Sequence, residues 1–174
     1  MHESSTIFGN ILRLTESSSS GQSASQNEDT ASLVKKMTGD ILDSLREPFK
    51  IKEVERKFPF MYEESMNSVL LQELARYNTL IETIKASLYT MQKTLEGKLV
   101  ANAETDDLQT CIKNNMIPEK WLKKSYPSKK SLLGYVDDLK RRLAVFEKWI
   151  ENGKPECFWI SGFFFTQSFL TGVK

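Results

Sequence analysis

The stretch "LLQELARYNTLIETIKASLYTMQKTL", residues 70–95, decides the fold class of this protein. Its large apolar residues recur in alternating steps of four and three, which is the heptad spacing of an α-helix with one apolar stripe. No Gly or Pro interrupts the pattern before Gly97. The spacing predicts a helix that begins near Glu63 and is about 50 Å long. The stripe consists of Leu70, Leu74, Tyr77, Ile81, Ile84, Leu88, Met91 and Leu95.

A second apolar stripe with the same spacing occupies residues 132–150, and Asn152-Gly153 supplies a C-terminal stop. Two long antiparallel helices are the simplest way for the two stripes to cover each other. Because Tyr77 and Phe146 lie within the stripes, a bundle is favoured over a free-standing dimeric zipper. We therefore expect a mainly α fold, a bundle of long antiparallel helices with a short aromatic-rich C-terminal segment. The second stripe consists of Leu132, Val136, Leu139, Leu143, Phe146 and Ile150.

The rest of the sequence divides by composition. Residues 1–15 form a short amphipathic segment, and residues 16–29 are a Ser-rich stretch that we expect to be a flexible linker. A helix is predicted to begin at Asp29-Thr30 and to end before Pro48. Shorter helices are predicted over residues 51–57 and 105–113. Residues 30–174 are expected to form the helical domain.

Composition excludes several classes of protein. The 174 residues are 40% hydrophobic and carry a formal net charge of +1, so no overall field attracts nucleic acid or an acidic membrane. The start of the sequence does not resemble a secretory signal, and no apolar stretch is long enough to span a bilayer. Cys111 and Cys157 lie far apart and fit no metal-binding spacing. We expect free thiols in a reducing, cytosolic compartment.

Catalytic templates are absent from the sequence. There is no phosphate-binding loop and no dinucleotide fingerprint, and His2 is the only histidine. Adjacent carboxylates such as Asp137-Asp138 point about 100° apart on a helix, which suits a solvated face better than acid–base catalysis. We expect no catalytic residue, no metal ligand and no cofactor site in this protein.

One charge asymmetry leaves an alternative open. Residues 113–142 contain nine basic residues against three acids, with Trp121, Tyr126 and Tyr135 interleaved. This pattern is compatible with a surface for RNA or an acidic partner. A solvated face whose aromatic residues anchor a connector is favoured, because the whole sequence is nearly neutral and no RNA-binding motif accompanies the lysines.

The stretch "FWISGFFFTQSFLTG", residues 158–172, is the most apolar part of the sequence. It needs a surface to pack against, since exposing each large apolar side chain forfeits about 1.5–3 kcal/mol. If its neighbours are missing, the protein is expected to expose an apolar patch and to aggregate. The alternative is that the stretch is buried within these 174 residues.

Three stretches together resemble the C-terminal region of dynein heavy chains, and of the axonemal branch in particular. They are "YEESMNSVLLQELARYN" (62–78), "IPEKWLKKSYPSKKSL" (117–132) and "PECFWISGFFFTQSFLTGV" (155–173). The likeness is good over residues 60–174 and weak over residues 1–59. Thr166 stands where the family usually has proline, and Tyr135 where it often has tryptophan.

The resemblance implies that these residues are a small part of a motor of several thousand residues, in the cytoplasm, cytoskeleton and ciliary axoneme. They would be the helical part that follows the sixth AAA+ module and begins the C-terminal domain, ending before a β-rich portion. The expected partners are the rest of the heavy chain, and through it intermediate chains, light chains and, indirectly, microtubules. ATP and magnesium would act in the longer protein, and neither membrane nor nucleic acid is expected as a partner.

No catalytic residue carries over from the family, so the role expected of this segment is that of a non-catalytic structural or regulatory cap of the AAA+ ring. The alternative is an independent α-helical module that binds a partner helix through one of the two stripes. The residues expected to act in packing or at an interface are Tyr77, Trp121, Tyr126, Pro127, Phe146, Trp159, Phe163 and Gln167.

Overall fold

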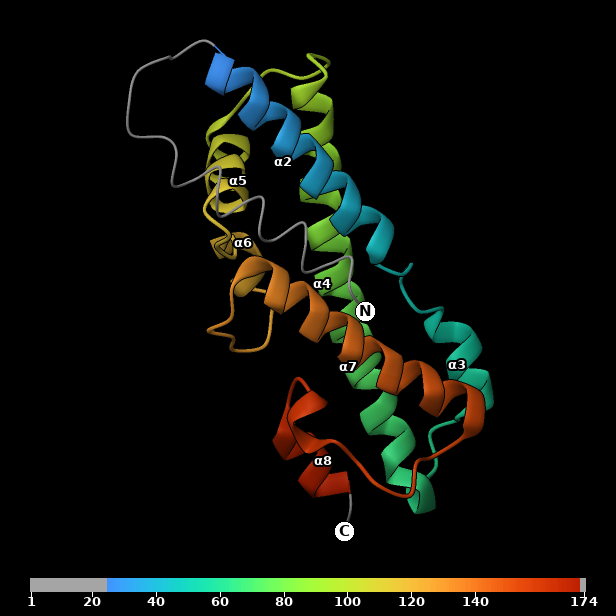
Figure 1. Ribbon diagram of the computed structural model, residues 1–174. Coiled ribbons are helices and arrows are strands. Elements are labelled where there is room, and N and C mark those ends of the chain that lie inside the picture. Colours follow the sequence, from blue (N-terminus) through green and yellow to red (C-terminus); the bar gives the residue numbers. More distant parts are fainter. Residues whose placement is uncertain (1–24, 173–174) are drawn as a thin grey trace. The chain divides into compact units, whose positions relative to one another are not determined.

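The computed structural model describes residues 25–172, with side chains from residue 30, and this part of the protein has helices and no strand (Figure 1). The prediction of a mainly α fold is confirmed. The protein divides into two compact units, Met1–Leu33 and Val34–Lys174, and the helices that form the site lie in the second. The α-helices are α2 (Ser25–Ser44), α3 (Ile51–Lys57), α4 (Ser65–Leu95), α5 (Ala103–Lys113), α6 (Glu119–Leu122), α7 (Leu132–Asn152) and α8 (Thr166–Gly172).

Helix α4 is the centre of the second unit and contacts α3, α5, α6, α7 and α8. The predicted stripe from Leu70 to Met91 is buried, while Leu95 at its end is half-buried. A short 3-10 helix, η1 (Tyr62–Glu64), precedes α4. At the other end Gly97 adopts φ +71, and Lys98 and Gly97 donate to the carbonyls of Lys93 and Thr94. This is a Schellman motif, which needs the left-handed conformation that glycine adopts without strain.

Helix α7 runs in the opposite sense to α4 but crosses it obliquely instead of lying along its length (Figure 1). At the crossing the rings of Tyr77 and Phe146 lie 5.3 Å apart. Because α7 covers only part of the α4 stripe, the shorter helices cover the remainder. The apolar face of α7 also differs in detail from the expected stripe: Trp149 is buried, whereas its neighbour Ile150 is half-buried.

Hydrogen bonds at helix ends and connections hold the short elements in place. Asn102 and Thr105 form a reciprocal capping box at the start of α5. The backbone N–H of Leu132, at the start of α7, donates to the carbonyl of Asn115 at 2.9 Å. The side-chain amide of Asn78 on α4 both accepts from the N–H of Phe49 and donates to its carbonyl, each at 2.7 Å. The last two sets of bonds tie two connections to the long helices, while the capping box begins α5.

The N-terminal boundary differs from the sequence prediction. Helix α2 begins at Ser25, earlier than the expected cap at Asp29, so the last residues of the predicted Ser-rich linker are helical. The amphipathic segment 1–15 and residues 16–24 of that linker lie outside the described residues. Among the residues that the structure describes, Cys111 and Cys157 are free thiols. None of the described helices has both the length and the apolar character required to cross a lipid bilayer.

Candidate functional site

The C-terminal segment, residues 158–172, returns to the middle of the second unit and completes an aromatic cluster. We call this cluster the aromatic junction, because it joins α4, the loop after α6, α7 and the C-terminal segment. Tyr77 meets Phe164 edge-on at 5.1 Å between ring centroids, and Phe163 lies 4.9 Å from Phe169. Such pairs contribute about 0.5–1.5 kcal/mol each beyond the area that they bury. Its members are Tyr77, Tyr126, Phe146, Trp149, Phe158, Phe163, Phe164 and Phe169.

Polar side chains of α4 bind the backbone of the C-terminal segment. The hydroxyl of Tyr77 donates a 2.6 Å hydrogen bond to the carbonyl of Gly162. The carboxylate of Glu73, which is fully buried, accepts hydrogen bonds from the backbone N–H groups of Phe164 and Phe165 and pairs with Arg76 at 2.9 Å. Both part-buried backbone donors therefore have a buried acceptor.

Arg142 on α7 holds a second side of the junction together. Its guanidinium lies 3.8 Å above the ring of Tyr126 and 5.4 Å from that of Trp159. Its Nε donates a 2.7 Å hydrogen bond to Asp138, whose other carboxylate oxygen pairs with Lys130. Burial opposes ionisation of Asp138, but the hydrogen bonds from Lys130 and Arg142 outweigh it and hold the pKa of this carboxyl below its ordinary value.

Three tyrosines of this region are kept neutral by their surroundings. Burial raises the pKa of Tyr135 to about 12, and it raises the pKa values of Tyr77 and Tyr126 further still. Tyr77 and Tyr135 use their hydroxyl groups in hydrogen bonds, to Gly162 and with Ser125. The Tyr126 hydroxyl is buried and has no hydrogen-bond partner among the residues that the structure describes. The region thus suits packing and positioning rather than proton transfer at neutral pH.

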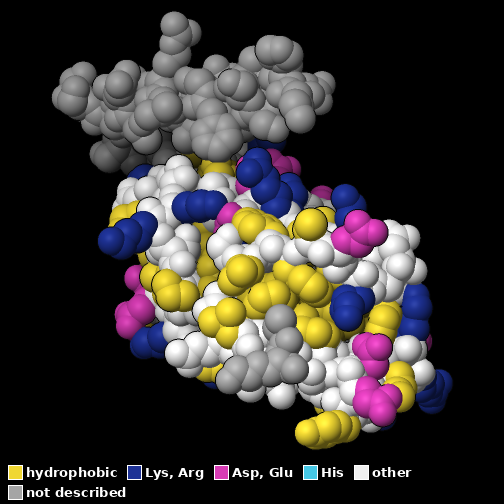
Figure 2. Space-filling model, turned by 90° about the horizontal axis from the view of Figure 1, so that it is seen from below, with side chains coloured by type: hydrophobic (Ala, Val, Ile, Leu, Met, Phe, Trp, Pro, Cys, Tyr) yellow, Lys and Arg dark blue, Asp and Glu magenta, His cyan; other side chains and the backbone are white. Residues whose placement is uncertain are grey.

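The outer side of the C-terminal segment is exposed and apolar. Trp159, Ile160, Phe165 and Leu170 are 39–58% exposed, although they alternate with buried members of the junction. Residues 60–62, just before α4, add further exposed apolar side chains. Figure 2, which views the structure from below, shows hydrophobic side chains gathered on the face turned toward the viewer. We use the name apolar end for the exposed apolar side chains of residues 60–62 and for these four side chains of the C-terminal segment.

A groove of about 790 Å³ opens beside the apolar end, between the start of α4 and the C-terminal segment. Its lining includes Met61, Tyr62, Met66 and Phe158 together with the carboxylate-bearing Glu63. The lining is mixed, because it also includes the polar residues Glu64, Ser65, Ser68, Lys154 and Thr171. A concave surface that combines apolar and polar groups is typical of a contact surface for another polypeptide.

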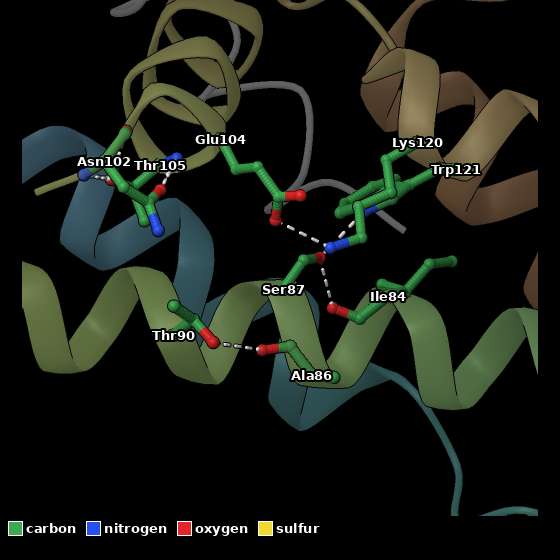
Figure 3. Close-up of polar contacts among 9 residues, drawn as sticks. All are labelled: Ile84, Ala86, Ser87, Thr90, Asn102, Glu104, Thr105, Lys120 and Trp121. Carbon is green, nitrogen blue, oxygen red and sulfur yellow. Dashed lines mark hydrogen bonds and ion pairs between the residues drawn. The ribbon is translucent and has the colours of Figure 1, made fainter.

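A separate cleft of about 370 Å³ lies between α4, α5 and α6 (Figure 3). The indole N–H of Trp121 donates to Ser87 Oγ at 2.8 Å, and Ser87 in turn donates to the carbonyl of Ile84. Lys120 and Glu104 form an ion pair of 2.8 Å between α6 and α5. The polar groups drawn in Figure 3 are thus paired with one another. This arrangement anchors α6 to α4 and to α5.

Comparison with known proteins identifies the family. Residues 1–174 match the family model for the C-terminal domain of dynein heavy chains. The protein belongs to that family. It is 44% identical over 172 residues to dynein axonemal heavy chain 1 of Rattus norvegicus and 41% identical over 172 residues to dynein axonemal heavy chain 3 of Mus musculus. It is also 42% identical over 173 residues to dynein axonemal heavy chain 12 of Homo sapiens.

These alignments include 99% of the sequence, so the likeness extends through residues 1–59, where the sequence motifs are weak. They span only 4% of the rat and mouse relatives and 6% of the human one. The 174 residues therefore correspond to a small fraction of the length of these axonemal dynein heavy chains.

The site residues predicted for this dynein segment do not all lie together. Tyr77, Tyr126, Phe146 and Phe163 meet in the aromatic junction, and Trp159 lies at the apolar end. Trp121 is fully buried in the separate contact between α4 and α6. Pro127 and Gln167 are exposed and lie outside the junction.

Sequence reasoning missed Glu73 and Arg142, the two charged residues that organise the junction. A signal for Glu73 existed, because it lies three residues after Leu70 and four before Tyr77, on the same helical face. Arg142 likewise falls three residues after Leu139 and four before Phe146. A charge on an apolar stripe is a sign of a buried pair or a buried backbone contact.

Proposed function

We propose that this protein is a helical part of the C-terminal domain of an axonemal dynein heavy chain, where it serves as a non-catalytic structural or regulatory cap of the AAA+ motor ring. In this proposal the rest of the heavy chain is its direct partner. This protein has no direct contact with intermediate chains, light chains or microtubules, which are partners of the heavy chain as a whole. The segment acts in the ciliary axoneme and holds no cofactor of its own, while ATP and magnesium act elsewhere in the heavy chain.

The observation that carries this proposal is the two-sided character of the C-terminal segment. Phe163 and Phe169 face the protein's own core, whereas Phe165 and Leu170 on the same segment are about half exposed. A side chain of this size gains about 1.5–3 kcal/mol when it leaves water, so a set of them on one surface favours contact with a further apolar surface. The apolar end is the surface that we expect to face the ring.

The alternative of an independent helix-binding module receives less support. The stripe of α4 and most of the stripe of α7 are buried against helices of the same protein, so they are not free to take a partner helix. Binding of RNA is also less favoured, because five of the nine basic residues in 113–142 already form ion pairs. These five are Lys120, Lys123, Lys130, Lys140 and Arg142.

The proposal is tested by mixing the purified protein with a heavy-chain motor region that lacks it and measuring the dissociation constant. Replacing Phe165 and Leu170 with Ser should weaken binding at least about tenfold, since removal of each apolar contact loses more than about 1.4 kcal/mol. Replacement of Leu99, which is 45% exposed outside the apolar end, with Ser is the matched control and should bind normally.

Two outcomes contradict the proposal. One is unchanged binding by the Phe165 and Leu170 variants when the control also binds normally. The other is ATP hydrolysis or tight microtubule binding by the isolated protein, because a structural cap has neither activity. A sedimentation experiment on the protein alone separates the alternatives further, since an autonomous module gives one discrete species and an uncovered apolar end promotes association.

A further inference from the structure

We infer that the C-terminal segment is a releasable strap, and that the buried carboxylate of Glu73 is the latch that holds it on α4. This inference rests on the proposed function for its biological meaning. It adds to that function an account of how the apolar end is held in position. The hydrogen bonds that support it join α4 to the C-terminal segment.

The latch is built from a single helix. Glu73, Tyr77 and Ser65 all belong to α4, and each binds backbone atoms of the C-terminal segment. Glu73 accepts from two consecutive N–H groups, one on each carboxylate oxygen, with the Phe165 bond at 3.1 Å. Tyr77 donates to the carbonyl of Gly162 at 2.6 Å, and Ser65 donates to that of Gly172 at 2.7 Å.

Glu73 is the decisive member because its side chain has no exposed surface. A carboxylate is an acceptor only, and here its oxygens are shared between the two backbone donors and the guanidinium of Arg76. If the segment lifts away, water replaces the backbone donors. If instead the carboxylate is removed while the segment stays, two part-buried N–H groups lose their acceptor, which disfavours the docked position.

A hinge precedes the segment. Gly153 adopts φ +90 and ends α7, and residues 154–157 that follow it belong to no helix. In the part of the protein that the structure describes, α4 is the one other helix to which the backbone of the segment is hydrogen-bonded, and residues 153–157 connect the segment to α7. We therefore expect the segment to detach as one unit while α4 stays folded. Opening would uncover Trp149 and Phe146, which contact Phe163 in the docked position.

The inner and outer sides of the segment are linked by this latch. The hydrogen bonds from the N–H groups of Phe164 and Phe165 to Glu73 fix the backbone where the side chain of Phe163 points inward and that of Phe165 points outward. A partner that binds the apolar end therefore binds the docked position. By thermodynamic reciprocity, stabilising the latch strengthens that binding and releasing it weakens that binding.

The experiment is hydrogen exchange measured by mass spectrometry on the whole protein. Glu73→Gln keeps the volume of the side chain and one acceptor oxygen, and Tyr77→Phe removes only the hydroxyl bond to Gly162. We expect the amides of residues 160–172 to exchange about 10- to 100-fold faster in Glu73→Gln and by a smaller factor in Tyr77→Phe. Amides of residues 80–91 and 136–149 should exchange at their original rates.

Glu82→Gln is the matched control, since Glu82 lies on the same helix, carries the same charge and is exposed. It should leave the exchange of residues 160–172 unchanged. Equal acceleration throughout α4 and α7 in Glu73→Gln would show global destabilisation and overturn the latch. Unchanged exchange of the segment would overturn it as well. Because the readout requires no motor region, a failed latch and a failed docking surface are observed separately.

Discussion

The indole N–H of Trp121 donates a 2.8 Å hydrogen bond to Ser87 Oγ, joining residues that are 34 positions apart in the sequence. Trp121 has no exposed surface, and its helix α6 is only four residues long. A helix this short is not stable by itself. The contact of Trp121 with α4 therefore helps to fix the position of α6, together with the ion pair between Lys120 and Glu104.

Replacing Trp121 with Phe should lower the free energy of unfolding by about 1–3 kcal/mol, because the substitution removes volume and the bond to Ser87. A double-mutant cycle with Ser87→Ala, followed by urea denaturation, should give a coupling of about 1 kcal/mol between the two sites. Leu122→Ala, at the exposed neighbouring position, is the control. Additive effects of the two substitutions would mean that the hydrogen bond contributes nothing to stability.

Two glycines should respond in opposite directions to replacement by Ala. Gly153 has φ +90 and an extended ψ, a region that is nearly restricted to glycine, so Gly153→Ala should destabilise the protein by about 1–3 kcal/mol. Gly39 lies inside α2, and an added methyl group there meets no atom within 4 Å. Gly39→Ala should therefore stabilise by up to about 1 kcal/mol. Thermal denaturation distinguishes the pair, and a change of the same sign at both positions contradicts the expectation.

Arg142→Lys should be destabilising although the charge is kept. A lysine ammonium cannot reproduce the planar contact with Tyr126 or the directed bond from Nε to Asp138. The expected loss in the free energy of unfolding is about 1–2 kcal/mol. Arg141→Lys, at the exposed neighbouring position, provides the comparison and should change stability little. Equal effects of the two substitutions would assign no special role to Arg142.

Stability should fall in acid through Asp138. Its folded pKa is lower than the unfolded value of about 3.9, so its contribution is present above that value and is lost as the pH falls below it. Urea denaturation at a series of pH values should show Asp138→Asn less stable than the original protein at pH 7, with the two converging in acid. Asp137→Asn removes an exposed charge and should follow the original curve. A constant difference at every pH contradicts this assignment.

In alkali, stability should fall through the buried tyrosines. Their pKa values are raised in the folded protein, to about 12 for Tyr135, so the unfolded state releases protons first. The contribution of these tyrosines to the free energy of unfolding is then constant below about pH 10 and decreases as the pH rises above it. Ultraviolet absorbance of tyrosinate should rise in two steps, the later one coinciding with loss of the circular dichroism of helices. A single step near pH 10 with intact helices would show that these tyrosines are accessible to solvent.

The long helices were predictable because a heptad pattern needs only local information. The stripe from Leu70 onward predicted α4, and the glycines at 97 and 153 marked the ends of α4 and α7. The oblique crossing was not predictable in this way, since it depends on how Tyr77 and Phe146 pack across the contact. Helix α6 was also missed, because its four residues carry no periodic pattern and form a helix through the contact of Trp121 with α4.

The site was predictable in its aromatic residues and not in its polar ones. Tyr77 and Phe163 were selected from the stripe and from the family motif, and both lie in the aromatic junction. Glu73 was not selected, because a glutamate in a helix is ordinarily solvated and its acceptor role depends on backbone donors 91 and 92 residues away. The spacing of residues within a helix cannot predict backbone partners that lie so far away in the sequence.

The position of α8 against α4 affects how the protein is made. Helix α4 emerges from the ribosome well before residues 166–172, which cover part of its apolar surface in the folded protein. During synthesis that surface stays open while more than 70 further residues are added, beginning at Glu96. Nascent polypeptides in this condition are prone to aggregate and are natural clients of chaperones that bind apolar segments. The pace of translation over the last part of the sequence therefore sets how long the growing polypeptide needs such protection.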